Sequence, residues 1–138
     1  MNRKGFTLLE LVTVIIIVGI LAAAGVPLYL NYVEDAKIAR AKATIDAIYS
    51  AERVHYQKEG SFWPSGSTES DIDVTDGTDE IETNLGIKLD PSIANDWTFT
   101  INNAGNADAL TITANGKSGG NAAGLSTSFY SNSGTFSN

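Results

Sequence analysis

The feature that most constrains this chain is a long apolar run close to its start. From Phe6 to Leu30, about 25 residues, the only charged side chain is that of Glu10. As a helix rising roughly 1.5 Å per residue, this run reaches about 38 Å, which exceeds the ~30 Å hydrocarbon thickness of a bilayer. The run is therefore long enough to span a membrane, and its composition predicts that it does.

The residues around the run indicate the direction in which it crosses. Arg3 and Lys4 stand directly before it, and basic residues favour the cytoplasmic side of a membrane helix. The rest of the chain is polar and rich in Gly, Ser, Asn and Thr, and it is then exported. We expect a single-pass precursor in the inner or cytoplasmic membrane, and the total of 138 residues suits one folding unit.

Composition excludes some classes of function. The chain has no cysteine, so the exported part has to be stable without disulfides. Its net charge is -7, whereas nucleic-acid binding is driven by clustered Lys and Arg. We therefore expect no nucleic acid to bind the bulk of the surface.

The N-terminal region is open to more than one interpretation. Its order of basic residues, apolar run and three alanines is typical of a secretory signal cleaved after Ala24, which would release a secreted, non-catalytic binding domain. An uncleaved anchor, with Glu10 reaching the cytoplasmic interface, is a further alternative. A carboxylate in the membrane interior costs a few kcal/mol, however, and the core of a signal peptide has no use for one.

A third interpretation accounts for these residues together. The stretch KGFTLLELV, from Lys4 to Val12, closely resembles the processing motif of type IV pilins and of the pseudopilins of type II secretion. The resemblance covers about the first third of the chain. It continues through the small, aromatic and proline residues Gly19, Ala22, Ala23, Gly25, Pro27, Tyr29 and Tyr32.

The resemblance implies a precursor whose short leader is removed. In that family a prepilin peptidase cuts after the glycine and methylates the new N-terminus, which here implies cleavage between Gly5 and Phe6 and N-methylation of Phe6. The family's glutamate corresponds to Glu10. A buried carboxylate is tolerated when a positive group pairs with it, and we expect the N-terminal ammonium of a neighbouring subunit to do so and to set the axial step between subunits.

The function implied by the resemblance is polymerisation rather than catalysis. The apolar run is stored in the bilayer and then packs in the core of a helical homopolymer, an extracellular or periplasmic filament. Implied partners are further copies of the chain, the prepilin peptidase, and an inner-membrane assembly platform with its cytoplasmic ATPase. The match at Gly19 and Pro27 implies that the helix between them can unwind in the filament. The residues do not distinguish adhesion, motility, DNA uptake or secretion as its role.

After Pro27 the pattern changes from uniformly apolar to amphipathic. The chain should stay helical to Glu59, because Gly60 and Pro64 then provide a stop. Pro27 itself lacks a backbone donor, so we expect a kink or a looser turn there. The positions that fall on one face, at steps of three and four residues, are Ile38, Ala41, Ile45, Ile48, Glu52 and Tyr56.

Beyond residue 96, apolar residues alternate with threonine, as in half-buried strands. The stretches 97–101 and 110–114 should form an antiparallel hairpin, with further strands at 126–130 and 135–136. One face of this sheet needs cover, which the apolar stripe of the helix supplies. The predicted class is α+β, a long N-terminal helix whose C-terminal half packs on a small antiparallel sheet, which is also the pilin fold that the resemblance implies.

These observations predict three parts of the chain, and the third part is itself divided into three segments. The parts are a leader (1–5), a transmembrane and filament-core half of the helix (6–32) and an exported head (33–138). The segments of the head are an amphipathic half-helix (33–59), a connecting segment (60–96) and the sheet (97–138).

Two features are expected within the connecting segment. Trp63 is large and apolar, and it should pin the segment to the core. A short helix should run from Asp79 to Leu85, capped by Thr78 and ended by Gly86.

Sites for metal binding or catalysis are weakly indicated. Between Glu69 and Glu82 lie seven acidic residues and no basic one. A calcium loop from Asp71 would have its glycine one residue late, so a solvated acidic loop is the simpler interpretation. We therefore expect no cofactor and no metal site. Calcium is the alternative, with Asp71, Asp73, Asp79 and Glu82 as its candidate ligands.

The remaining candidates do not support an enzyme. His55 is the only histidine, so it offers at most one metal ligand or one catalytic base, and we expect a surface or packing role for it. Gly116-Lys117-Ser118 resembles the end of a phosphate-binding loop, but Thr111 stands where the first glycine is needed. We predict a polar turn there and no catalytic activity.

Overall fold

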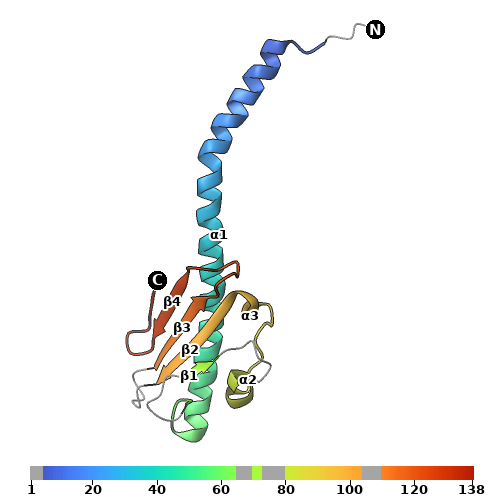
Figure 1. Ribbon diagram of the computed structural model, residues 1–138. Coiled ribbons are helices and arrows are strands. Elements are labelled where there is room, and N and C mark those ends of the chain that lie inside the picture. Colours follow the sequence, from blue (N-terminus) through green and yellow to red (C-terminus); the bar gives the residue numbers. More distant parts are fainter. Residues whose placement is uncertain (1–4, 65–69, 73–79, 104–109) are drawn as a thin grey trace. The chain divides into compact units, whose positions relative to one another are not determined.

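The computed structural model describes residues 5–64, 70–72, 80–103 and 110–138, and Figure 1 shows their elements. The chain divides into two compact units, Met1–Asp35 and Ala36–Asn138. Helix α1 (Leu8–Glu59) begins in the first unit and ends in the second.

The first unit is helical from Leu8 onward, and residues 5–32 are all exposed. Pro27 does not interrupt the helix. A helix that is apolar all round is stable in lipid or among other helices rather than in water. In the described part of the chain, α1 is the one helix long and apolar enough to cross a membrane.

The second unit packs the end of α1 against one face of an antiparallel sheet (Figure 1). Within the described residues the sheet has five strands, whose spatial order is their order in the chain. The predicted strands at 97–101, 110–114, 126–130 and 135–136 are confirmed, and so is the α+β class. The strands are β1 (Ser70–Ile72), β2 (Trp97–Asn103), β3 (Leu110–Gly116), β4 (Ser126–Tyr130) and β5 (Thr135–Ser137).

Alternation along the strands turns one face of the sheet inward. In β2 every second residue is buried, as a period of two requires. The register places Phe99 opposite Ala114 and Ile101 opposite Ile112, and Ile112 in turn faces Phe129 on β4. Because residues paired across strands share a face, these side chains form one continuous apolar layer.

The C-terminal half of α1 covers this layer. Its buried positions follow the predicted helical face as far as Glu52, but Tyr56 is 37% exposed. Tyr56 contacts the ring of Phe62 instead, with 4.8 Å between ring centroids, at the end of the helix. The buried residues of α1 are Ala41, Ile45, Ile48, Ala51 and Glu52.

The expected short helix in the connecting segment is present as α2 (Glu80–Leu85). Ile81 and Leu85 are buried and join the core. Gly86 follows in a left-handed conformation, with φ of 65°, which is typical of the residue that ends a helix. Thr78, the expected cap, lies outside the described residues.

The connecting segment also holds two elements that the sequence pattern did not predict. Strand β1 pairs with β2 at the edge of the sheet, and α3 (Ile93–Asp96) directly precedes β2, with Ile93 buried. Elements of three or four residues are too short to show a hydrophobic period. Tertiary contacts rather than local pattern therefore decide them.

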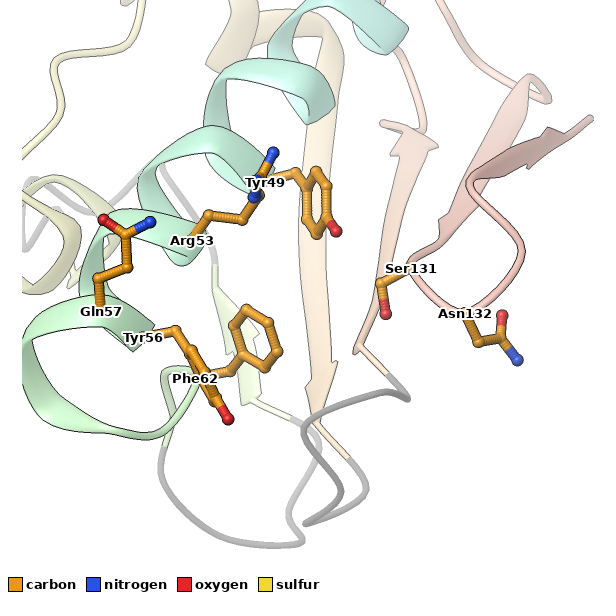
Figure 2. A pocket seen from close by; sticks show the side chains of 7 residues that line it. All are labelled: Tyr49, Arg53, Tyr56, Gln57, Phe62, Ser131 and Asn132. Carbon is orange, nitrogen blue, oxygen red and sulfur yellow. The ribbon is translucent and has the colours of Figure 1, made fainter.

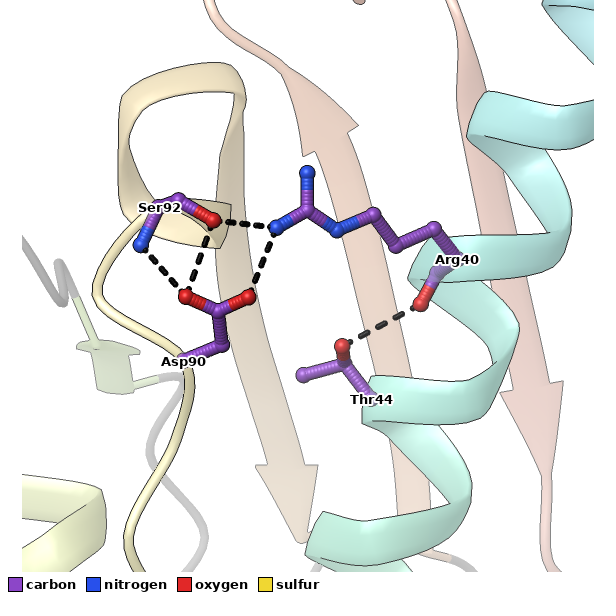
Figure 3. A network of polar contacts seen from close by, with 4 residues as sticks. All are labelled: Arg40, Thr44, Asp90 and Ser92. Atoms are coloured by element: carbon purple, nitrogen blue, oxygen red, sulfur yellow. Dashed lines mark hydrogen bonds and ion pairs between the residues drawn. The ribbon is translucent and has the colours of Figure 1, made fainter.

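Polar contacts tie α1 to the segment before α3 (Figure 3). Arg40 donates to Asp90 Oδ2 at 2.9 Å and to the hydroxyl of Ser92. The backbone N–H and the hydroxyl of Ser92 donate to Asp90 Oδ1 at 2.9 and 2.8 Å. These bonds, the Ser92 N–H first among them, hold the pKa of Asp90 below its ordinary value.

Two buried polar side chains hold the turn that follows α1. Glu52 Oε2 accepts the Trp63 N–H at 2.9 Å, and Asn103 Nδ2 donates to the carbonyls of Phe62 and Pro64 at 3.2 and 3.4 Å. Within the described residues, Glu52 Oε1 and Asn103 Oδ1 are buried and have no hydrogen-bond partner. Burial raises the pKa of Glu52 to about 7. Trp63 packs against the core, as expected.

Candidate functional site

The residues marked for processing lie immediately before α1. Gly5, Phe6 and Thr7 precede the helix and are exposed, and Phe6 is 83% exposed. The Gly5–Phe6 peptide bond thus lies before α1 and between exposed residues, where a peptidase can reach it. The bond after Ala24, the alternative cleavage site, lies inside α1.

Thr7 and Glu10 form a reciprocal cap at the start of α1. The backbone N–H and the hydroxyl of Thr7 both donate to Glu10 Oε2 at 2.9 Å. The backbone N–H of Glu10 in turn donates to Thr7 Oγ1 at 3.3 Å. This is the capping box of the pattern Thr-x-x-Glu, in which each side chain satisfies a backbone donor of the first helical turn.

The capping box changes how the charge of Glu10 is to be understood. In the single chain the carboxylate already has two donors from Thr7, which lowers the cost of keeping it near apolar surroundings. Sequence reasoning missed Thr7, although the spacing of threonine and glutamate signals the motif. A single chain holds no neighbouring terminus, so the pairing of Glu10 with another subunit stays a prediction.

The apolar side chains that follow are exposed on all sides of the helix. Among the large apolar side chains of the run, the exposed fraction ranges from 44% at Val12 to 83% at Phe6. A Cβ added at Gly19 or Gly25 would meet no atom within 4 Å, so these glycines leave room for a neighbouring helix to approach. Unwinding between Gly19 and Pro27 concerns the filament and stays a prediction.

The other candidate site residues are not brought together in the described structure. Asp73 and Asp79 lie outside the described residues, and the structure gives only the backbone of Asp71, on β1, and of Glu82, on α2. No group of three or more His, Cys, Asp or Glu side chains that could hold a metal occurs among the described residues. Calcium binding by the acidic segment therefore stays a prediction.

His55 lies at the end of α1, and the Gly116-Lys117-Ser118 stretch lies at the end of β3 and in the turn after it. His55 Nδ1 lies 3.0 Å from the carbonyl oxygen of Ser61 and the residue is half-buried, so it packs at the end of α1. Gly116 ends β3 and Ser118 lies in the turn that follows. Neither place offers a phosphate site at the start of a helix.

Comparison with known proteins confirms the resemblance found in the sequence. The family described as prokaryotic N-terminal methylation motif matches residues 1–26. A fimbrial protein of Neisseria meningitidis serogroup A is 41% identical over 70 residues, which cover 51% of this chain and 41% of that protein. The type IV major pilin protein PilE1 of Neisseria gonorrhoeae is 40% identical over 70 residues, covering 51% of this chain and 42% of the pilin.

A more distant relative supports the same family. The type IV major pilin protein PilA of Myxococcus xanthus is 34% identical over 61 residues, covering 44% of this chain and 28% of that protein. The chain thus spans less than half the length of these curated relatives. No solved structure matches. The chain carries the N-terminal methylation motif and is similar to type IV pilins.

Proposed function

We propose that this chain is a structural subunit of a type IV pilus or a related filament, with no catalytic role of its own. It is made as a membrane precursor, processed by a prepilin peptidase between Gly5 and Phe6, and polymerised through the first part of α1. The observation that carries the proposal is the start of α1: an apolar helix exposed on all sides, with one carboxylate in its first turn and an exposed glycine three residues before it.

The exposed apolar run has to be covered by lipid or by other helices at every stage. Each large apolar side chain contributes roughly 1.5–3 kcal/mol when it leaves water, so the run is not stable in solvent. Lipid supplies the cover before assembly, and helices of other subunits replace lipid in the filament core. Because lipid and packed helices are about equally apolar, an inner-membrane platform and its cytoplasmic ATPase drive extraction.

Glu10 gives the polymer its register. Removal of the leader creates an ammonium group on Phe6, and methylation of that group preserves its positive charge. A neighbouring subunit brings this group to the carboxylate of Glu10, where a charge-assisted bond adds to the two bonds from Thr7. Since an unpaired carboxylate in the apolar core is costly, displaced packings are disfavoured.

The processing step is tested by mass spectrometry of the mature N-terminus. We expect a chain that begins at N-methylated Phe6. A chain that begins at Gly25 would overturn the proposal and would support a secreted domain released after Ala24. The two outcomes are distinguishable because a mature chain that begins at Gly25 no longer contains Glu10.

Substitution of Glu10 separates its charge from its capping role. Glu10→Gln retains an acceptor for the Thr7 donors but removes the charge, whereas Glu10→Ala removes both. We expect both variants to lose their leader normally and to form few or no filaments in electron micrographs. Glu34→Ala, which removes an exposed acid on the same helix outside the apolar run, is the control and should assemble. Normal filaments from Glu10→Gln would refute the charge pairing.

A further inference from the structure

The second unit contains a pocket that the filament function does not use. It has a volume of about 700 Å³, within the range of roughly 300–1,000 Å³ that is usual for small-molecule sites. Figure 2 shows the last turns of α1 on one side and the turn after β4 on the other. The residues that line it are Tyr49, Arg53, Tyr56, Gln57, Phe62, Ser131 and Asn132.

The described lining of the pocket carries a charge opposite to that of the chain. Among the described residues that line it, Arg53 is the one charged residue and none is acidic, although the whole protein carries -7. Arg53 is exposed and makes no ion pair or hydrogen bond with the part of the chain that the structure describes. Its guanidinium is therefore available to an anion, and its fork of donors matches a carboxylate.

Aromatic rings form the apolar part of the pocket. The rings of Tyr49 and Phe62 lie in the space between α1 and the turn that carries Ser131 and Asn132 (Figure 2). Phe62 is held in place because Tyr56 lies against its ring, with 4.8 Å between centroids. Phe62 itself is buried, so the accessible aromatic surface is that of Tyr49, which is half-buried, and of Tyr56, which is 37% exposed. Such rings offer flat apolar surfaces at little cost in side-chain entropy.

The remaining lining groups suit a ligand with many hydroxyls. Gln57 and Asn132 have amides that donate and accept, and the tyrosines and Ser131 have hydroxyls that do both. Inorganic anions would use Arg53 but not the rings, and a purely apolar ligand would leave Arg53 and the amides without partners. A ring-shaped molecule with apolar faces, several hydroxyls and one carboxylate uses all three kinds of group.

We propose that this pocket binds an acidic sugar, a pyranose ring that carries a carboxylate. Arg53 pairs with the carboxylate, the rings of Tyr49 and Tyr56 cover the C–H face of the sugar, and the amides of Gln57 and Asn132 bind its hydroxyls. The site lies entirely in the second unit, so binding does not depend on leader removal or on polymerisation. A filament of such subunits would present one site per copy.

The test uses the full chain in micelles of a detergent without a sugar headgroup. Tetragalacturonic acid is titrated in a calorimeter, and its fully methyl-esterified form, which has the same rings but no charge, is the matched ligand control. We expect saturable binding of the acid and binding at least about tenfold weaker for the ester, the loss that removal of one charge-assisted contact produces. Excess inorganic phosphate should compete poorly.

Variants locate the binding at the pocket. Arg53→Gln should weaken binding of the acid about tenfold without weakening the ester further, because only the charged contact is lost. Lys58→Gln removes an exposed cation of the same helix that does not line the pocket, and it should leave binding unchanged. The proposal is overturned if the acid does not bind, if the ester binds as well as the acid, if phosphate competes equally, or if Lys58→Gln has the same effect as Arg53→Gln.

Discussion

Replacing Glu52 by glutamine should stabilise the second unit at neutral and alkaline pH. Glu52 is fully buried, and its Oε1 has no hydrogen-bond partner among the described residues. Burial raises the pKa of its carboxyl from the ordinary 4.5 to about 7. The folded protein therefore holds a proton on Glu52 over a pH range in which the unfolded chain has released it.

The sign of the effect follows from this difference in proton binding. Between pH 4.5 and 7 the folded state binds more protons than the unfolded state, so the free energy of unfolding falls as the pH rises. Each pKa unit corresponds to about 1.4 kcal/mol. The contribution of Glu52 to the free energy of unfolding is therefore greatest below pH 4.5. It is about 3 kcal/mol smaller once the pH is above 7.

Glutamine removes this dependence because it has no charge to bury. Its side-chain oxygen still accepts the Trp63 N–H, so the turn after α1 keeps its contact. At pH 4.5 we expect the free energy of unfolding of Glu52→Gln to lie within about 1 kcal/mol of the wild-type value. At pH 8 it should be about 3 kcal/mol higher than that of the wild type.

The assay is urea unfolding of the full chain in micelles, followed by tryptophan fluorescence. Both tryptophans, Trp63 and Trp97, lie in the second unit, so the signal reports on that unit. Glu59→Gln, which removes an exposed carboxylate at the end of α1, is the control for general charge effects. The reasoning is refuted if the difference between Glu52→Gln and the wild type is the same at pH 4.5 and pH 8, or if it has the opposite sign at pH 8.

Three further substitutions test the packing of the second unit by the same unfolding assay. Gly116→Ala should lower the free energy of unfolding by at least about 3 kcal/mol, because its Cβ would lie 1.7 Å from the backbone oxygen of Ala122. Asn115→Ala, at the exposed neighbouring residue, is the control and should be near neutral. A Gly116→Ala protein as stable as the wild type would contradict the geometry. Phe99→Ala should cost about 4 kcal/mol, since Phe99 is completely buried; a loss under 1 kcal/mol would show that the layer is not packed as described. Arg40→Gln should cost less than about 1 kcal/mol, because the side chains of Arg40 and Asp90 are 45% and 65% exposed.

The parts that could be predicted from the sequence are those with a local pattern. The apolar run, the glycine before it and Glu10 lie within a few residues of one another, and their chemistry depends little on distant segments. The helix and the three longer strands, at 97–101, 110–114 and 126–130, show their own periods, of 3.6 and 2 residues. The capping box of Thr7 and Glu10 belongs to the same class and could have been read from the spacing.

Other features depend on segments that are distant in the chain, and only the tertiary structure decided them. The spacing of Glu52 places it on the inner face of α1, but its raised pKa depends on its burial in the folded second unit. Strand β1 and helix α3 are too short to form without neighbours. The pocket exists because the turn after β4 lies across from Arg53. Local pattern thus determines which elements form, whereas burial, pKa and binding surfaces depend on what each element is packed against.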